Sequence, residues 1–148
     1  GGYRLLVGGR WTVGGAHPNG HANVQVRSDW RRFEGTLVRR DGDYFWSVSN
    51  LESAGDTMSS AAGLIEEQLI QSGGVVPVSG SATMRLHRPS PLSNSAVLSL
   101  DPPHRFDDHM DHVLLADQTV LIGPTKADHI RCTAIDTAAV LVFRDGQW

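Results

Sequence analysis

Histidine and aspartate side chains are concentrated in one short stretch of the sequence. Residues 104–112 contribute six of them, namely His104, Asp107, Asp108, His109, Asp111 and His112. Because imidazole and carboxylate groups together bind Zn²⁺ or Fe²⁺, one hypothesis is a metal site formed by His104, Asp108, His109 and His112. The spacing matches neither a zincin helix nor a calcium-binding loop, and two prolines precede the stretch. The competing interpretation is a polar loop, and we expect no bound metal or cofactor.

A second candidate site is the group of arginines around Trp30. Arg27, Arg31 and Arg32 lie within six residues of one another, and guanidinium groups bind phosphate and carboxylate through paired hydrogen bonds. The three side chains could hold an anion, or they could form a solvated face. Trp30 is either a core side chain or an exposed anchor for a partner, because tryptophan is frequent at the centres of protein interfaces.

The remaining reactive side chains do not form a recognisable catalytic set. Cys132 is the only cysteine, which excludes a disulfide framework. His129 lies three residues away, so in a strand the two side chains would point to opposite faces. His17 and His21 flank an Asn-Gly turn and are expected in an exposed loop. No nucleophile elbow, phosphate-binding loop or dinucleotide fingerprint is present, and we therefore expect no enzyme activity.

The composition is typical of a single globular domain. The chain has 148 residues, 40% of them hydrophobic, and a formal net charge of −3, which argues against nucleic acid or an anionic membrane as the partner. Twelve of the thirteen basic residues are arginine, which suits phosphate recognition but also fits an arginine-rich codon usage. No segment reaches the roughly 20 apolar residues that a membrane span needs, so we expect a cytoplasmic protein.

The elements that must position these residues are strands. Short segments of alternating polarity recur every eight to twelve residues, which indicates an antiparallel β-sandwich. Residues 3–7 and 10–13 should form a hairpin on glycine turns, and residues 64–70 fit a strand or a short helix, with strands favoured. A long loop is expected over residues 51–61. Further strands are expected at residues 23–26, 35–39, 44–48, 75–78, 82–87, 96–100, 113–116, 119–122, 129–133 and 139–143.

Part of this strand order occurs twice. Residues 11–26 resemble residues 119–131, and residues 37–44 resemble residues 141–148, with an Arg-Asp-Gly turn at the same place in both copies. Internal similarity of this kind indicates a repeated unit. The chain then divides into a unit over residues 1–90, a linker over 91–112 and the beginning of a second unit over 113–148. If the similarity reflects only the common form of β-hairpins, residues 113–148 add strands to the same sandwich.

Three motifs of the first unit resemble the forkhead-associated (FHA) domain over about residues 3–88. Residues 12–15 (Thr-Val-Gly-Gly) resemble its first glycine turn, residues 30–33 (Trp-Arg-Arg-Phe) resemble its binding-loop block, and residues 73–76 (Gly-Gly-Val-Val) resemble a later turn. The segment around residues 88–93 is similar to bacterial proteins in which a diverged second FHA domain follows the first. The resemblance implies an eleven-stranded sandwich that binds phosphothreonine peptides through the loops at one end.

The sequence departs from the FHA pattern at the residues that would hold a phosphate. Gly15 stands where the family has arginine, Trp30 where it has serine and Phe33 where it has histidine. The resemblance therefore implies a degenerate phosphate site. Its partner-binding residues would be Arg27, Trp30, Arg31, Arg32 and Asn50.

The sequence as a whole predicts an all-β, antiparallel sandwich that acts as a protein-interaction module in bacterial signalling. The partner would be a protein, phosphorylated on threonine or not. Two alternatives stay open at this point. One is a structural sandwich within a larger multidomain protein, and the other is a metal-dependent enzyme that uses residues 104–112.

Overall fold

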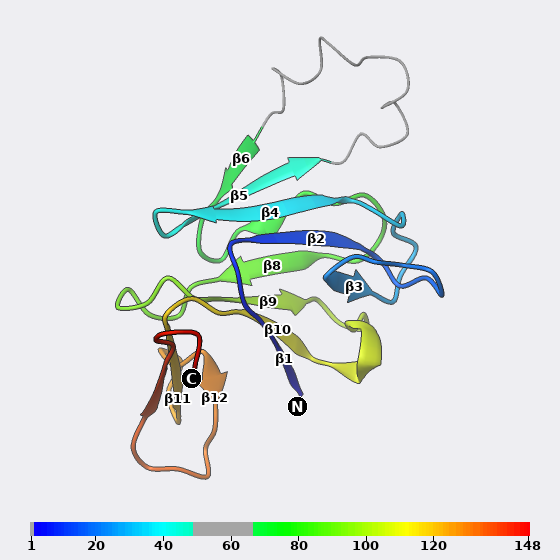
Figure 1. Ribbon diagram of the computed structural model, residues 1–148. Helices are drawn as coiled ribbons and strands as arrows, with labels where there is room; N and C mark the ends of the chain where they lie inside the picture. Colours follow the sequence, from blue (N-terminus) through cyan, green and yellow to red (C-terminus); the bar gives the residue numbers. More distant parts are fainter. Residues whose placement is uncertain (1, 49–66) are drawn as a thin grey trace.

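Strands form nearly all of the regular structure in the computed structural model, which describes residues 2–48 and 67–148. Two five-stranded sheets face each other, and a three-stranded sheet projects from one side (Figure 1). The all-β sandwich expected from the alternating sequence is confirmed. Within the described residues, no helix has the length and apolar character that crossing a membrane requires.

The first sheet is built on two hairpin-connected strands in its centre. β4 pairs antiparallel with both β2 and β5, and β3 adds to β2 in parallel. The turn between β4 and β5 uses Asp41 and Gly42 at φ of 52° and 81°, as a two-residue turn of a twisted hairpin requires. The strand order is β3-β2-β4-β5-β6, with β2 at Arg10–Gly15, β3 at Val24–Val26, β4 at Gly35–Arg40, β5 at Asp43–Val48 and β6 at Glu67–Ile70.

The second sheet joins β1 to four strands from later in the chain. β7, β8, β9 and β10 follow one another as antiparallel neighbours, and β1 completes the sheet by pairing in parallel with β10. The strand order is β1-β10-β9-β8-β7, with β1 at Tyr3–Leu6, β7 at Val75–Val76, β8 at Met84–His87, β9 at Ala96–Leu100 and β10 at His112–Leu115.

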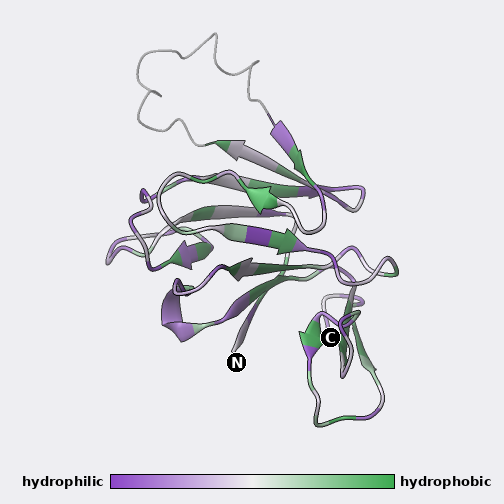
Figure 2. Cartoon of the chain, turned by 180° about the vertical axis from the view of Figure 1, so that it is seen from behind, coloured by the Kyte–Doolittle hydropathy of each residue, from purple (hydrophilic) through white to green (hydrophobic). Residues whose placement is uncertain are grey.

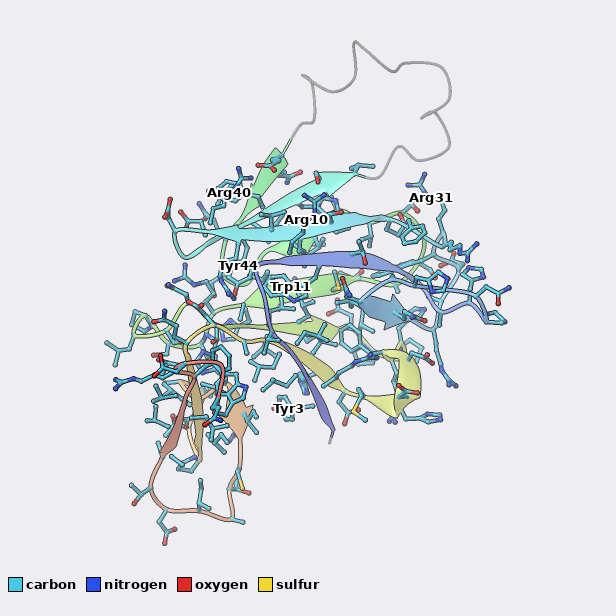
Figure 3. The ribbon with its side chains drawn as sticks, in the orientation of Figure 1. Tyr3, Arg10, Trp11, Arg31, Arg40 and Tyr44 are labelled. Atoms are coloured by element: carbon cyan, nitrogen blue, oxygen red, sulfur yellow. The ribbon has the colours of Figure 1, made fainter. Side chains whose placement is uncertain are left out.

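The main core lies between these two sheets. Trp11 from β2 and Tyr44 from β5 stack with ring centroids 6.4 Å apart, and Figure 3 shows both in the interior. Each large apolar side chain removed from water stabilises the fold by roughly 1.5–3 kcal/mol. The largest fully buried side chains are Trp11, Trp46, Tyr44, Phe106, Leu37, Met84, Leu86, Leu98, Leu114 and Leu115.

The expected hairpin between residues 3–7 and 10–13 is wrong. β1 pairs with β10, with Tyr3 opposite His112, whereas β2 belongs to the other sheet. The chain crosses between the sheets at Gly8, whose φ is 110°. The indole N–H of Trp11 donates to the Val7 carbonyl over 3.1 Å and fixes this crossing. A glycine turn serves a crossover as well as a hairpin, so the sequence signal did not distinguish them.

The third sheet, β12-β11-β13, contains β11 at Thr119–Gly123, β12 at Ile130–Arg131 and β13 at Ala139–Val142. β11 pairs in parallel with β12 and antiparallel with β13. Val120 packs on the outer face of the second sheet, in a small core with Leu114 and Val97. Ser95 and His129 add a hydrogen bond between the imidazole Nε2 and the Ser95 carbonyl, 3.2 Å long.

Several boundaries differ from those that the sequence indicated. The stretch 91–112 contains β9, a central strand of the second sheet, so it is not a linker between units. β10 also belongs to that sheet rather than to a separate unit that begins at residue 113. The sheets are mixed rather than purely antiparallel. Within the described residues the two facing sheets have ten strands, against the eleven implied by the FHA resemblance.

Candidate functional site

Four connecting segments among the described residues meet at one end of the sandwich, which we call the loop end. They are residues 16–23 between β2 and β3, residues 27–34 between β3 and β4, residues 77–83 between β7 and β8, and residues 101–111 between β9 and β10. Hydrogen bonds connect them to one another, as the following paragraphs describe. Arg31 marks this end in Figure 3, and Arg40 marks the opposite end.

Gly14 and Gly15 allow the loop 27–34 to lie directly on β2. A Cβ atom on Gly14 would lie 1.9 Å from the carbonyl oxygen of Arg32, and one on Gly15 would lie 2.5 Å from that of Trp30. The Gly15 N–H donates to the Arg31 carbonyl over 2.7 Å. This contact leaves no room for any side chain at Gly15.

A buried carboxylate, Glu34, joins two of the loops. Its Oε1 accepts the Arg31 N–H at 2.8 Å and the Ser79 hydroxyl at 2.5 Å, and its Oε2 accepts the Arg31 guanidinium and the Ser79 N–H, both at 3.3 Å. Burial raises the pKa of Glu34, but the hydrogen bonds from Ser79 and Arg31 outweigh burial and hold the pKa below its ordinary value. The charged carboxylate thus connects the turn 77–83 to the loop 27–34.

Asp29 makes a second connection between the same two loops. Its Oδ1 accepts both the N–H and the hydroxyl of Ser81, each over 3.0 Å. These hydrogen bonds from Ser81 hold the pKa of Asp29 below its ordinary value. Together with Glu34, this contact fixes the backbone of the loop 27–34 to the turn 77–83 at two points.

The loop end contains a hollow of about 430 Å³ beside the start of that loop. Arg27 enters it with a half-exposed side chain, and the Arg27 Nε donates to Asp107 Oδ1 over 2.9 Å. This hydrogen bond holds the pKa of Asp107 below its ordinary value. Ser28 contributes a hydroxyl whose oxygen accepts the Trp30 N–H at 3.3 Å, so its own proton remains a donor. The hollow is lined by Ala16, His17, Pro18, Arg27, Ser28 and Asp107.

The arginines predicted to act together have different surroundings. Arg27 lines the hollow, whereas Arg31 and Arg32 follow it on the same loop without lining it. Arg31 pairs with Glu34, and the Arg32 guanidinium donates to a neutral acceptor, the carbonyl of Asn19. The loop therefore presents three cationic side chains to solvent from its exposed positions.

Trp30 is a core residue and not a surface anchor. Only 3% of it is exposed, and it packs in the main core. This corrects the prediction that Trp30 contacts a partner. Asn50, the last of the predicted partner-binding residues, lies outside the described residues.

The candidate metal ligands do not converge. His112 is on β10 and stacks on Tyr3 at 4.7 Å between ring centroids, and Asp108 pairs with Arg4 at 3.7 Å. Asp108 and His109 lie in the short 3-10 turn η3, at Asp107–His109, which Figure 2 shows as hydrophilic. In residues 2–48 and 67–148, no three His, Cys, Asp or Glu side chains are grouped so as to hold a metal ion. The hypothesis of a metal site at residues 104–112 is therefore not supported there.

The pair His129 and Cys132 is also not a catalytic pair. His129 is buried, and its Nδ1 accepts the Leu121 N–H at 2.9 Å. The proton must then lie on Nε2, which donates to the Ser95 carbonyl. Burial holds the pKa of His129 below its ordinary value. Nδ1 bonds to β11 and Nε2 bonds to the residue before β9, so the imidazole connects the two sheets as a structural group.

Sequence reasoning missed the residues that build the loop end. Glu34 attracted no attention because a single glutamate before a strand resembles ordinary surface charge. Two features of the sequence could have indicated Glu34. It lies three residues after Arg31, and Ser79 and Ser81 lie in a turn that the fold brings to the loop end. No sequence pattern indicates Ser28. It lines the hollow only because the fold places Asp107, from the segment between β9 and β10, at the same site.

Comparisons of the chain with protein-family models, with curated proteins and with solved structures find no match, so the function must be inferred from the loop end itself.

Proposed function

We propose that this chain is a protein-interaction module that binds a partner peptide across the loop end. Arg27 would hold an anionic side chain of that peptide. The observation that carries the proposal is the hollow in which Arg27, Ser28 and His17 come together. Guanidinium, hydroxyl and imidazole groups are donors of the kinds that bind phosphate and carboxylate. The sequence resemblance to FHA domains, which bind phosphothreonine peptides through loops at one end, supports the same location.

The rigidity of the loop end also supports a binding role. Glu34 and Asp29 fix the loop that carries Arg27 by accepting hydrogen bonds from the neighbouring turn. The Arg27 N–H donates to the Arg105 carbonyl over 3.1 Å, which joins the loop to a third segment. A binding surface that is already ordered loses less conformational entropy when a partner binds.

The ion pair between Arg27 and Asp107 determines which anion should bind best. An incoming anion must compete with the Asp107 carboxylate for the Arg27 guanidinium. A phosphate group carries more charge than a carboxylate and offers three acceptor oxygens. We therefore expect a phosphothreonine peptide to bind more tightly than the same peptide with glutamate, and the threonine form to bind most weakly.

Calorimetric titration with a library of phosphothreonine peptides, and with the threonine and glutamate forms of each, tests the proposal. Arg27→Ala should weaken the binding of the phosphorylated form about tenfold to a hundredfold, because it removes charge-assisted hydrogen bonds that contribute about 1.5–3 kcal/mol each. Arg40→Ala is the matched control. Arg40 is an equally exposed arginine that pairs with Glu67 at the other end of β4 (Figure 3).

Two results would contradict the proposal. If Arg27→Ala and Arg40→Ala bind the peptides equally well, the hollow does not hold the anion. If no peptide of any form binds the wild type, the sandwich has a structural role rather than a peptide-binding one.

A further inference from the structure

The third sheet has the same strand pairing as part of the first sheet. β11 pairs in parallel with β12 and antiparallel with β13, just as β2 pairs in parallel with β3 and antiparallel with β4. The registers give equivalent positions. Thr119 opposite Val142 corresponds to Arg10 opposite Val38, and the two sheets can be compared residue by residue from that pair.

Side-chain hydrogen bonds recur at equivalent positions. The Leu121 N–H donates to His129 Nδ1 over 2.9 Å, and the equivalent Thr12 N–H donates to Asn23 Oδ1 over the same distance. His129 precedes β12 as Asn23 precedes β3. In the third sheet the side chain joins β11 to the loop before its parallel partner β12, and in the first sheet it joins β2 to the loop before its parallel partner β3.

Backbone hydrogen bonds at the start of each unit recur in the same way. The Phe143 N–H donates to the Gln118 carbonyl over 2.8 Å, and the Arg39 N–H donates to the Gly9 carbonyl over 2.8 Å. The acceptor residue of each bond directly precedes the first paired residue of its strand, which is Thr119 in β11 and Arg10 in β2. A general likeness among hairpins would not reproduce the register, the parallel partner and these bonds together.

The turn after β13 repeats the turn after β4. Asp145 and Gly146 have φ of 53° and 79°, close to the 52° and 81° of Asp41 and Gly42. The Arg144 N–H donates to the Gln147 carbonyl over 2.8 Å, and the Gln147 N–H donates back over 2.9 Å. The chain has therefore already reversed its direction at Gln147, antiparallel to β13.

The two turns lead to different surroundings. Tyr44 follows the first turn and is fully buried, whereas Trp148, at the equivalent position, is 46% exposed. On the preceding strand Leu37 is 0% exposed, whereas the equivalent Leu141 is 37% exposed. In the first unit, Leu37 and Tyr44 belong to the core between the two sheets. In the third sheet the same apolar positions lie open to solvent.

We propose that β11–β13 is the first half of a second sandwich with the fold of the first, completed by a strand that continues from Trp148 along the free edge of β13, the edge with which no strand of the described residues pairs. The Phe143 N–H points towards β11, so strand alternation directs the N–H groups of Val140 and Val142 to the free edge. The entering strand pairs with these groups as β5 pairs with β4. Its alternate side chains cover Leu141 as Tyr44 and Trp46 cover Leu37. The proposal does not depend on the function proposed for the loop end.

Hydrogen–deuterium exchange tests the proposal on the full chain that the gene encodes, compared with a chain that ends at Trp148. Residues 139–143 should exchange at least about tenfold more slowly in the full chain, because an open strand edge loses protection by local opening. Residues 35–48 should exchange alike in both chains and show that the first unit is folded.

Three outcomes would overturn the proposal. In the first, residues 139–143 exchange equally fast in both chains. In the second, the encoded chain ends within a few residues of Trp148. In the third, the shorter chain sediments as a dimer with residues 139–143 already protected, which would mean that a second copy covers the edge.

Two variants of the full chain sharpen the test. Leu141→Asp should abolish the slow exchange of residues 139–143, because it places a charge on the face that the new strand covers. Residues 35–48 should exchange at the same rate as in the unsubstituted full chain. Val140→Thr is the control, because Thr36 occupies the equivalent position in β4, and it should keep the protection. If Leu141→Asp also keeps it, no second core forms there.

Discussion

Replacing Glu34 with Gln should destabilise the protein by about 3 to 6 kcal/mol. The Glu34 carboxylate is 1% exposed and accepts four hydrogen bonds, two from Arg31 and two from Ser79. Glutamine keeps only one acceptor oxygen, so its amide nitrogen would face two donors. A hydrogen bond to a charged group contributes about 1.5–3 kcal/mol, and the loss of the two longer bonds gives the stated range. For a chain of this size the melting temperature should fall by roughly 6–24 °C.

The pH dependence provides a second measure of the same effect. The folded state holds the pKa of Glu34 below its ordinary value, so in acid the unfolded chain binds a proton there before the folded chain does. The carboxylate thus contributes its full stability above about pH 4.3, the ordinary value for glutamate. That contribution is lost as the pH falls further. The difference between wild type and Glu34→Gln should therefore narrow below about pH 4.3.

Urea denaturation at pH 7 and at lower pH measures both quantities. Glu67→Gln is the control, because Glu67 is a partly exposed carboxylate on β6 that pairs with Arg40. An ion pair of that kind contributes up to about 1 kcal/mol. The reasoning is refuted if Glu34→Gln lowers the free energy of unfolding by no more than Glu67→Gln does.

Three further substitutions test other parts of the structure. Gly14→Ala should destabilise the fold by more than about 2 kcal/mol in urea denaturation, because its Cβ would lie 1.9 Å from a backbone oxygen of the adjacent loop. Asp107→Asn should tighten the binding of anionic peptides in calorimetry, because it removes the carboxylate that competes for Arg27; unchanged affinity would argue against the hollow as the site. His129 has a lowered pKa, so the unfolded chain takes up a proton first and wild-type stability should fall below about pH 6.5. His129→Asn, which copies Asn23, should remove its share of that slope while the variant stays folded.

The sequence predicted the local part of the fold. The turn at Asp41 and Gly42 and the aromatic strand that follows it were predicted from turn chemistry and alternation, and both lie where expected. The pairing of β1 with β10 was not predicted, because it joins residues 109 positions apart and no short-range pattern reports it. The same limit explains why β9 was taken for part of a linker.

The loop end was predicted only in part, for a related reason. Composition drew attention to Arg27, Arg31 and Arg32, but only the folded chain shows that Arg27 meets Asp107 and that Arg31 meets Glu34. Trp30 was ambiguous because its type suits a core and an interface equally well. Burial decides between those roles, and burial is a property of the whole fold.

The pairing of β1 with β10 has a consequence for biosynthesis on the ribosome. The partner of β1 is synthesised 109 residues after β1 itself. At about 5–20 residues per second, that delay is roughly 5 to 20 s. During this interval the hairpin of β4 and β5 can form, whereas β1, with the apolar residues Leu5 and Leu6, cannot yet pair. Until β10 has left the ribosome, β1 therefore lacks the strand that it pairs with in the folded sheet.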